Sequence, residues 1–449
     1  MRRVNRLGPR QKRWAIIIGL AAVSILILGI GAWWAKAQMQ PSEIAGNTSQ
    51  EYLPPTTTHA ATTATAKTSM PWPTYGYDAA RSHGNPALTH RPPFAERWIF
   101  RSGNLLEFPP VVAEGRMFVG QLKGRFYAVD TETGKTIWDH QTDHCSAASP
   151  AYSEGVVYAA FLAPVPCPKG EQGTQGFVAA WDAASGKELW RRQLAPVESS
   201  PLMMNGIVYV GTWDHFVYAL DAKTGKVRWQ VETDAQIVSS AAWVDAEQAG
   251  GAPAIVIGTN GGSLYALDAA SGKIRWQARS TDRLGSGREY FYATPTVAYG
   301  RVFIGNTDGW LYAYGAKSGT LLWAKSAGTY VYTAAVAADN VIYVGTYDGY
   351  IVAFDAGTGA ETWRASVPGA VHGAPTLMAG LLYFSTCARC GQNGIREAKA
   401  GPSGTYAIDI ATHKIVWSHP DGEYSPVVAD ENLVYLVGKG VIRGMVPSG

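Results

Sequence analysis

The stretches "DAASGKELW" at residues 182–190 and "DAASGKIRW" at residues 268–276 are nearly identical. Their Ser-Gly-Lys suggests a phosphate-binding loop, but such a loop needs a longer glycine-rich stretch that opens a helix. No helical pattern follows either copy. We therefore interpret the phrase as a structural unit. Its aspartate accepts backbone N–H bonds in a turn, its glycine takes a positive φ angle, and its tryptophan wedges between neighbouring units.

The phrase occurs seven times along the chain, each time ending on tryptophan. The other copies are "DTETGKTIW" (130–138), "DAKTGKVRW" (221–229), "GAKSGTLLW" (315–323), "DAGTGAETW" (355–363) and "DIATHKIVW" (409–417). Successive copies lie 39 to 54 residues apart, and an eighth tryptophan, Trp98, lies 40 residues before Trp138. A unit of about 40 residues that recurs with insertions is typical of architectures that repeat one supersecondary unit.

Each unit has the pattern of four short strands. In the sixth unit, apolar residues alternate within 341–346 and 350–355, which is the period of a β-strand. Asp348-Gly349 between these two runs is a hairpin turn signal. Four antiparallel strands repeated about every 40 residues predict the blades of a β-propeller.

The two ends of the repeat region complement each other. Three strands are predicted after Trp417 without a further tryptophan phrase, and one isolated strand is predicted around Trp98. Joining them completes an eighth blade and closes the ring without an open sheet edge. We therefore expect an all-β, eight-bladed β-propeller over residues 71–449, closed by its N-terminal strand.

The residues before the propeller predict a membrane anchor. Residues 1–13 carry six cations and are expected in the cytoplasm, and residues 14–35 are uncharged and long enough to span a bilayer as a helix. We interpret this span as a single-pass signal-anchor, although "AKA" at 35–37 leaves open cleavage of a signal peptide after Ala37. Residues 36–70, rich in Thr, Ala and Pro, are expected to be a disordered linker. The propeller is then placed on the periplasmic or extracellular side of the cell membrane.

Composition argues against a nucleic-acid partner. Apart from the six N-terminal cations, the chain has 32 Lys and Arg against 35 Asp and Glu. A nucleic-acid binder concentrates basic charge on its folded part. The folded part of this chain carries no such excess.

The repeat resembles that of pyrroloquinoline-quinone (PQQ) propeller proteins. The resemblance rests on "LYALDAASGKIRW", on the preceding "VYVGT" type of strand, and on "WPTYGYDAARS" at residues 72–82, which looks like the entry segment of that superfamily. It covers about residues 71–449. It implies a quinoprotein-type propeller, either a PQQ-dependent alcohol or sugar dehydrogenase or a non-catalytic relative such as the propeller lipoprotein of outer-membrane assembly.

One face of the predicted propeller carries the long loops. In such a blade, the links between blades and the turns between strands two and three emerge on the same face. Blade 2 has a long turn at 162–175, blade 7 has one at 387–404, and the link between blades 4 and 5 spans 279–295. Long loops on a rigid scaffold usually carry binding functions, so we expect a protein or envelope partner on this looped face.

Polar side chains just before each innermost strand should rim the central funnel. They are candidates for binding a small polar ligand or a cation, or else for hydrogen-bonding loop backbone and water around a solvated channel. Gln236, Glu289, Tyr330 and Tyr424 occupy such positions. The candidate ligand-binding residues are Glu107, His144, Glu198, Tyr290, Tyr292, Tyr332, His372 and Glu423.

The four cysteines lie on the looped face. Cys145 precedes the inner strand of blade 2 and Cys167 lies in its long turn, which predicts a disulfide in an oxidising compartment. Gly391 stands where a c-type haem site after Cys387 and Cys390 needs histidine. These two cysteines are expected to form a local disulfide and not a redox motif, because no helix start activates the first thiol. A zinc site of all four cysteines would require blades 2 and 7 to meet over the funnel.

Two functions remain after this comparison. In the catalytic members that the repeat resembles, the quinone lies between a tryptophan and a ring formed by two adjacent cysteines, with Ca²⁺ held by oxygens. This chain has no adjacent cysteine pair. We therefore expect a non-enzymatic binding or scaffold module for envelope proteins or polymers, with no cofactor, no metal and no catalytic residue. The alternative is a PQQ-dependent quinoprotein oxidoreductase with PQQ and Ca²⁺.

Overall fold

A computed structural model of the chain describes residues 43–54, 71–167, 175–281, 290–388, 390 and 398–448. Ile44–Ser280 and Arg288–Gly449 form one compact unit, and the propeller lies within it. Among the described residues, no helix is long and apolar enough to cross a membrane. The predicted cytoplasmic segment 1–13, the predicted membrane span 14–35 and residues 55–70 of the predicted linker lie outside the described residues.

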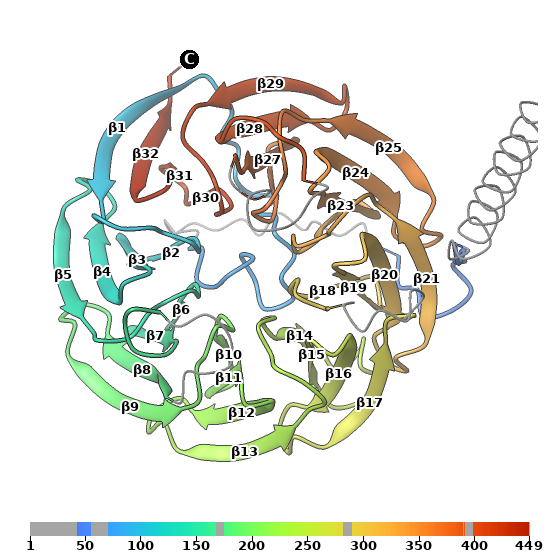
Figure 1. Cartoon of the computed structure of the whole chain (residues 1–449), viewed down its shortest axis with the longest axis horizontal. Coiled ribbons are helices and arrows are strands. Elements are labelled where there is room, and N and C mark those ends of the chain that lie inside the picture. The colour runs from blue at the N-terminus through green and yellow to red at the C-terminus, as the bar shows by residue number, and fades with distance from the viewer. Residues whose placement is uncertain are drawn as a thin grey trace, which may run out of the picture. The chain divides into compact units, whose positions relative to one another are not determined.

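The described strands form eight four-stranded antiparallel sheets arranged as the blades of a ring (Figure 1). The strands of the first four blades are β2 (Val111–Ala113), β3 (Arg116–Gly120), β4 (Arg125–Asp130) and β5 (Thr136–Gln141); β6 (Ala151–Ser153), β7 (Val156–Phe161), β8 (Gly176–Asp182) and β9 (Glu188–Leu194); β10 (Leu202–Met204), β11 (Ile207–Gly211), β12 (Phe216–Asp221) and β13 (Val227–Glu232); β14 (Ala242–Val244), β15 (Ala254–Gly258), β16 (Ser263–Asp268) and β17 (Ile274–Arg279).

The next three blades repeat the order, with the short strand innermost. They are β18 (Thr296–Ala298), β19 (Arg301–Gly305), β20 (Trp310–Gly315) and β21 (Leu321–Ser326); β22 (Val336–Ala338), β23 (Val341–Gly345), β24 (Tyr350–Asp355) and β25 (Glu361–Ser366); β26 (Thr376–Met378), β27 (Leu381–Thr386), β28 (Gly404–Asp409) and β29 (Lys414–His419).

The eighth blade joins the two ends of the propeller. It consists of β30 (Val428–Ala429), β31 (Val434–Val437), β32 (Val441–Pro447) and, as its outermost strand, β1 (Phe94–Arg101). β1 pairs antiparallel with β32, with Phe94 opposite Pro447 and Arg101 opposite Val441. The predicted closure by the N-terminal strand is confirmed.

The repeated phrase forms the turn and the contact between blades that its residues predict. In blade 2, Asp182 Oδ1 accepts hydrogen bonds from the backbone N–H and the hydroxyl of Ser185, and Gly186 has a φ of 73°. The indole of Trp190 donates to the carbonyl oxygen of Ala222 in the next blade, at 2.9 Å. Trp98 makes the same contact with Thr131, which places it as the eighth member of the set.

Apolar side chains on facing sheets fill the space between blades. Between blades 2 and 3, for example, Val178 and Ala180 pack with Val208 and Val210, all four completely buried. Burying one valine contributes about 1.5–3 kcal/mol relative to leaving it exposed. Because such contacts recur around the ring, the blades hold a fixed arrangement on which loops can vary.

Residues 72–85, here called the N-terminal strap, close one end of the central channel. In Figure 1 the blue trace before β1 crosses the middle of the ring. Backbone hydrogen bonds connect the strap to the inner strands β2, β6, β14, β18, β22 and β26. At its centre the fully buried Arg81 donates to the carbonyl oxygens of Ala241 and Tyr75. The strap therefore closes the channel at this end.

Residues 44–53 fall in the stretch for which we expected no fold, yet they contact blades 5 and 6. Ile44 bridges to Ala324 on the outer strand β21, and the buried Arg301 donates to the carbonyl oxygens of Glu51 and Asn47. These backbone contacts compensate for the polar composition of the segment, because they do not require apolar side chains.

Glu51 also explains one irregular copy of the phrase. Blade 5 has Gly315 at the position where each of the other six copies has aspartate. The Glu51 carboxylate takes the place of the missing aspartate, since its Oε2 accepts from the backbone N–H groups of Lys317 and Ser318. A side chain on residue 315 would collide with this carboxylate.

Candidate functional site

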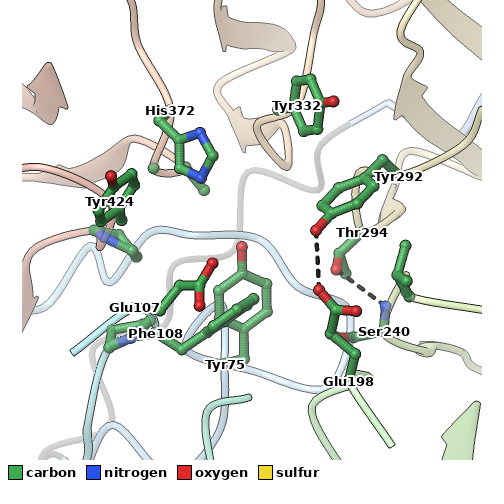
Figure 2. A pocket seen from close by; sticks show the side chains of 15 residues that line it. Tyr75, Glu107, Phe108, Glu198, Ser240, Tyr292, Thr294, Tyr332, His372 and Tyr424 are labelled. Carbon is green, nitrogen blue, oxygen red and sulfur yellow. Dashed lines mark hydrogen bonds between the residues drawn. The ribbon is translucent and has the colours of Figure 1, made fainter. Parts of the chain in front are cut away.

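The candidate site is a cavity of about 60 Å³ at the centre of the looped face, here called the funnel cavity. The strap supplies its floor through Tyr75, and the segments before the inner strands supply its walls. Figure 2 shows the carboxylates of Glu107 and Glu198 and the hydroxyl of Tyr75 directed toward a common space. The lining residues are Tyr75, Glu107, Phe108, Pro109, Glu198, Val238, Ser240, Tyr292, Thr294, Tyr332, His372, Gly373, Ala374, Tyr424 and Pro426.

Glu198 is held in place by two hydrogen bonds. Tyr292 donates its hydroxyl to Oε1 at 2.9 Å, and the indole of Trp213 donates to Oε2 at 3.1 Å. Burial raises the pKa of the Glu198 carboxyl to about 7, and the nearby charge of Glu107 adds to this shift, while both hydrogen bonds oppose it. Near neutral pH this carboxyl is therefore half protonated.

Glu107 has a different environment. Burial raises the pKa of its carboxyl. Ser425 donates to the backbone oxygen of Glu107, but no group among the described residues donates to its carboxyl oxygens, in contrast to Glu198. The cavity thus holds one fixed carboxylate and one that lacks a partner within the described part of the chain.

Five rings form a continuous aromatic wall around the other side of the cavity. Tyr292 and Tyr332 meet edge to face at 4.8 Å between centroids, and Tyr332 stacks on Tyr347 at 4.9 Å. The Tyr347 hydroxyl hydrogen-bonds with Nδ1 of His372, and His372 meets the ring of Tyr424 at 5.0 Å. Burial lowers the pKa of His372 to about 4, so its imidazole is neutral at pH 7.

The two disulfides lie on this face, as expected. Cys145 is bonded to Cys167, joining the segment before β6 to the β7–β8 loop. Cys387 is bonded to Cys390 and packs among the tyrosines behind the aromatic wall. Among the described residues, no group of three or more His, Cys, Asp and Glu could hold a metal ion, and the cysteines are all paired. The four-cysteine zinc alternative is therefore wrong.

The structure brings together five of the eight candidate residues and places three elsewhere. Glu107, Glu198, Tyr292, Tyr332 and His372 line the funnel cavity. His144 packs on Phe177 and pairs with Asp143, Tyr290 is about one-third exposed, and the buried Glu423 does not line the cavity. A side chain at the end of a link points either inward or along the rim, and residue type alone does not distinguish these directions.

Sequence reasoning missed several residues of the site, and three of them bear on its geometry. Tyr75 comes from the strap, and Trp213 and Tyr347 come from the turns between strands two and three. Both turn residues follow a Gly-Thr pair, in "GTWDH" and "GTYDG". Large aromatic side chains in this otherwise small turn were the available signal.

The eight four-stranded blades define a PQQ-like β-propeller, and the comparisons place the chain in a family. The family model described as outer membrane protein assembly factor BamB matches residues 93–163, 172–307 and 307–442. The chain belongs to this family, and the resemblance to PQQ-like propeller repeats is confirmed.

Similar proteins include both assembly factors and enzymes. The BamB protein of Salmonella typhimurium is 26% identical over 180 residues, which cover 30% of this chain and 46% of that protein. The quinohemoprotein alcohol dehydrogenase ADH-IIG of Pseudomonas putida is 31% identical over 130 residues, covering 24% of this chain and 17% of the enzyme. The chain thus matches less than half the length of each. The solved structure of BamB from Moraxella catarrhalis has a TM-score of 0.62 at 15% identity and covers 79% of this chain and 100% of that one, a likeness of fold.

The lining of the funnel cavity does not fit PQQ. PQQ is a flat three-ring tricarboxylate, whereas the cavity of about 60 Å³ presents two glutamates and, among its described lining residues, no lysine or arginine. Placing a trianion beside two carboxyl groups is electrostatically unfavourable. The Cys387–Cys390 disulfide also joins residues three apart and not neighbours. No catalytic step through this cofactor follows from the geometry.

Proposed function

We propose that this chain is a membrane-anchored extracytoplasmic propeller that acts as a non-enzymatic binding or scaffold module for envelope proteins or polymers. In this proposal residues 14–35 form a single-pass anchor and the propeller lies on the periplasmic or extracellular side. The membership in a family described as an outer membrane protein assembly factor supports a role in assembly. The partner itself follows from neither the sequence nor the fold.

The observation that carries the proposal is the pair of disulfide-bonded loops on one face. The longest turns, in blades 2 and 7, both begin on the face of the funnel cavity. Cys145–Cys167 joins the blade 2 turn to the segment before β6, and Cys387–Cys390 lies within the blade 7 turn. A disulfide restricts the conformations of a loop, which lowers the entropy that the loop loses when it binds a partner. Long loops held on a rigid scaffold are typical of recognition surfaces.

Site-specific photo-crosslinking tests this proposal. A photoreactive residue in place of Pro164 or of Pro402 on the looped face is expected to capture a discrete envelope partner. The same residue in place of Glu247, in the exposed turn between β14 and β15 on the opposite face, should not. Replacing residues 387–404 by the short turn of blade 6, residues 346–349, should weaken capture of the same partner from Pro164. Equal capture from both faces would contradict the proposal.

The alternative function is PQQ-dependent oxidation of an alcohol or sugar, and partial similarity to quinohemoprotein alcohol dehydrogenases is what favours it. Adding PQQ and Ca²⁺ to the purified chain and following quinone absorbance and dye-linked oxidation tests it. Tight PQQ binding with substrate-dependent dye reduction would replace the scaffold proposal with this one.

A further inference from the structure

The described lining of the funnel cavity holds two carboxyl groups and no basic side chain that would pair with them. Glu107 and Glu198 lie close enough for one charge to affect the other, and the Glu107 carboxyl has no hydrogen-bond donor among the described residues. The described lining contributes no lysine or arginine. Glu107 is half-buried, so its carboxylate is partly withdrawn from water while its oxygens are not completely enclosed. A cation supplied from outside the chain would pair with it and offset the partial loss of water.

The walls of the cavity favour an organic cation over a metal ion. A hard ion such as Ca²⁺ takes six to eight oxygen ligands, and no group of three or more suitable side chains is present among the described residues. Instead, the aromatic wall and Tyr75 surround the carboxyl groups. The face of an aromatic ring attracts an ammonium group through its quadrupole and packs against the attached methylenes.

The size of the cavity limits the cation further. A volume of about 60 Å³ is less than half of the roughly 150 Å³ of a cavity that binds benzene. This space suits an –NH₃⁺ group with one or two methylenes. The Glu107 carboxylate, which has no donor among the described residues, offers acceptors for the N–H groups of the ammonium. Glu198 already has a donor on each oxygen.

We propose that the funnel cavity binds a primary alkyl-ammonium group, with its N–H groups donating to Glu107 and its methylenes lying between Tyr75 and the aromatic wall. The group comes either from a free amine or from a lysine side chain of a polypeptide. This inference goes beyond the proposed function, because it depends on the cavity and not on the loops. The crosslinking experiment and the binding experiment can therefore fail separately.

Isothermal titration calorimetry on the full chain, purified in detergent, tests the proposal. The probes are n-propylamine hydrochloride for a free amine and acetyl-Gly-Lys-Gly-amide for a peptide lysine. Acetyl-Gly-norleucine-Gly-amide, which keeps most of the lysine chain but lacks the charge, is the matched control. We expect saturable binding of at least one amine and none of the norleucine peptide. Binding of the peptide assigns the site to a protein lysine, and binding of propylamine alone assigns it to a free amine.

Three variants separate a specific site from general charge attraction. Glu107→Gln should weaken amine binding at least tenfold, and Tyr332→Leu should weaken it while leaving both carboxyl groups in place. Glu247→Gln, an exposed carboxylate on the opposite face, should leave it unchanged. Far-UV circular dichroism of each variant confirms the fold. Absence of amine binding would overturn the proposal, and so would equal binding by wild type and Glu107→Gln. Displacement of the amine by an equal concentration of CaCl₂ would also overturn it.

Discussion

Replacing Glu198 with glutamine should change how the stability of the propeller depends on pH. The folded-state pKa of this carboxyl is raised to about 7, mainly by burial and also by the charge of Glu107. Glutamine has nearly the same shape but does not titrate. It keeps an oxygen that can accept the hydrogen bond from Tyr292 or Trp213. The substitution therefore removes the titration with little change in packing.

The sign and size of the effect follow from proton linkage. The Glu198 carboxyl has a pKa of 4.5 in the unfolded chain and about 7 in the folded chain. The folded chain therefore binds this proton more tightly. This contribution to stability is complete below about pH 4.5 and is lost as pH rises through 7. Between pH 5 and pH 8 the wild type should lose up to about 2.5 kcal/mol relative to Glu198→Gln, at about 1.36 kcal/mol per pKa unit. Screening by water in the half-buried cavity makes this an upper limit.

Thermal or urea unfolding of both proteins at pH 5, 6.5 and 8 measures this difference. At this chain length about 1 kcal/mol corresponds to a Tm shift of roughly 1–2 °C. The Tm of Glu198→Gln should rise by a few degrees relative to wild type as the pH increases from 5 to 8. Glu247→Gln, an exposed carboxylate in the β14–β15 turn, should follow wild type throughout. If wild type and Glu198→Gln change in parallel across this range, Glu198 does not titrate as the buried geometry requires.

Three further perturbations test the parts that position the cavity. Gly315→Asp restores the common form of the phrase and should expel the Glu51 carboxylate. We expect faster protease cleavage within residues 44–54. Unchanged cleavage would contradict the role of Glu51. Arg81→Leu should destabilise the propeller by about 2–4 kcal/mol in urea unfolding, because buried carbonyl oxygens lose their donor; a loss below about 1 kcal/mol would contradict this. Cys145→Ser with Cys167→Ser should cost about 3 kcal/mol, the loop-closure value for a separation of 22 residues, whereas wild-type stability in the double variant would show that the bond adds nothing.

The fold was largely predictable because the decisive interactions are local and repeated. Within one copy of the phrase, Asp182 caps its own turn and Gly186 supplies the positive φ that the turn needs. Trp190 reaches the equivalent turn of the next blade. Six of the eight tryptophans make this hydrogen bond among the described residues, and the strand around Trp98 closes the ring.

The site was predictable only in part. The position before each inner strand was sufficient to find Glu107, Glu198 and His372, because repeats place equivalent residues at equivalent points. It also selected His144, which turns to Phe177 and not to the cavity. The direction of a loop side chain depends on packing against neighbours from other blades, which no single repeat specifies.

The sequence by itself determined the eight blades, their closure and both disulfides, since each depends on periodicity and short-range pairing. Only the tertiary structure decided that Tyr75 and Arg81 close the channel and that Glu51 completes the turn at Gly315. The sequence separation between Glu51 and Lys317 is 266 residues. Contacts over such distances arise once the ring has formed. The acidic, aromatic character of the funnel cavity is therefore a property of the assembled propeller.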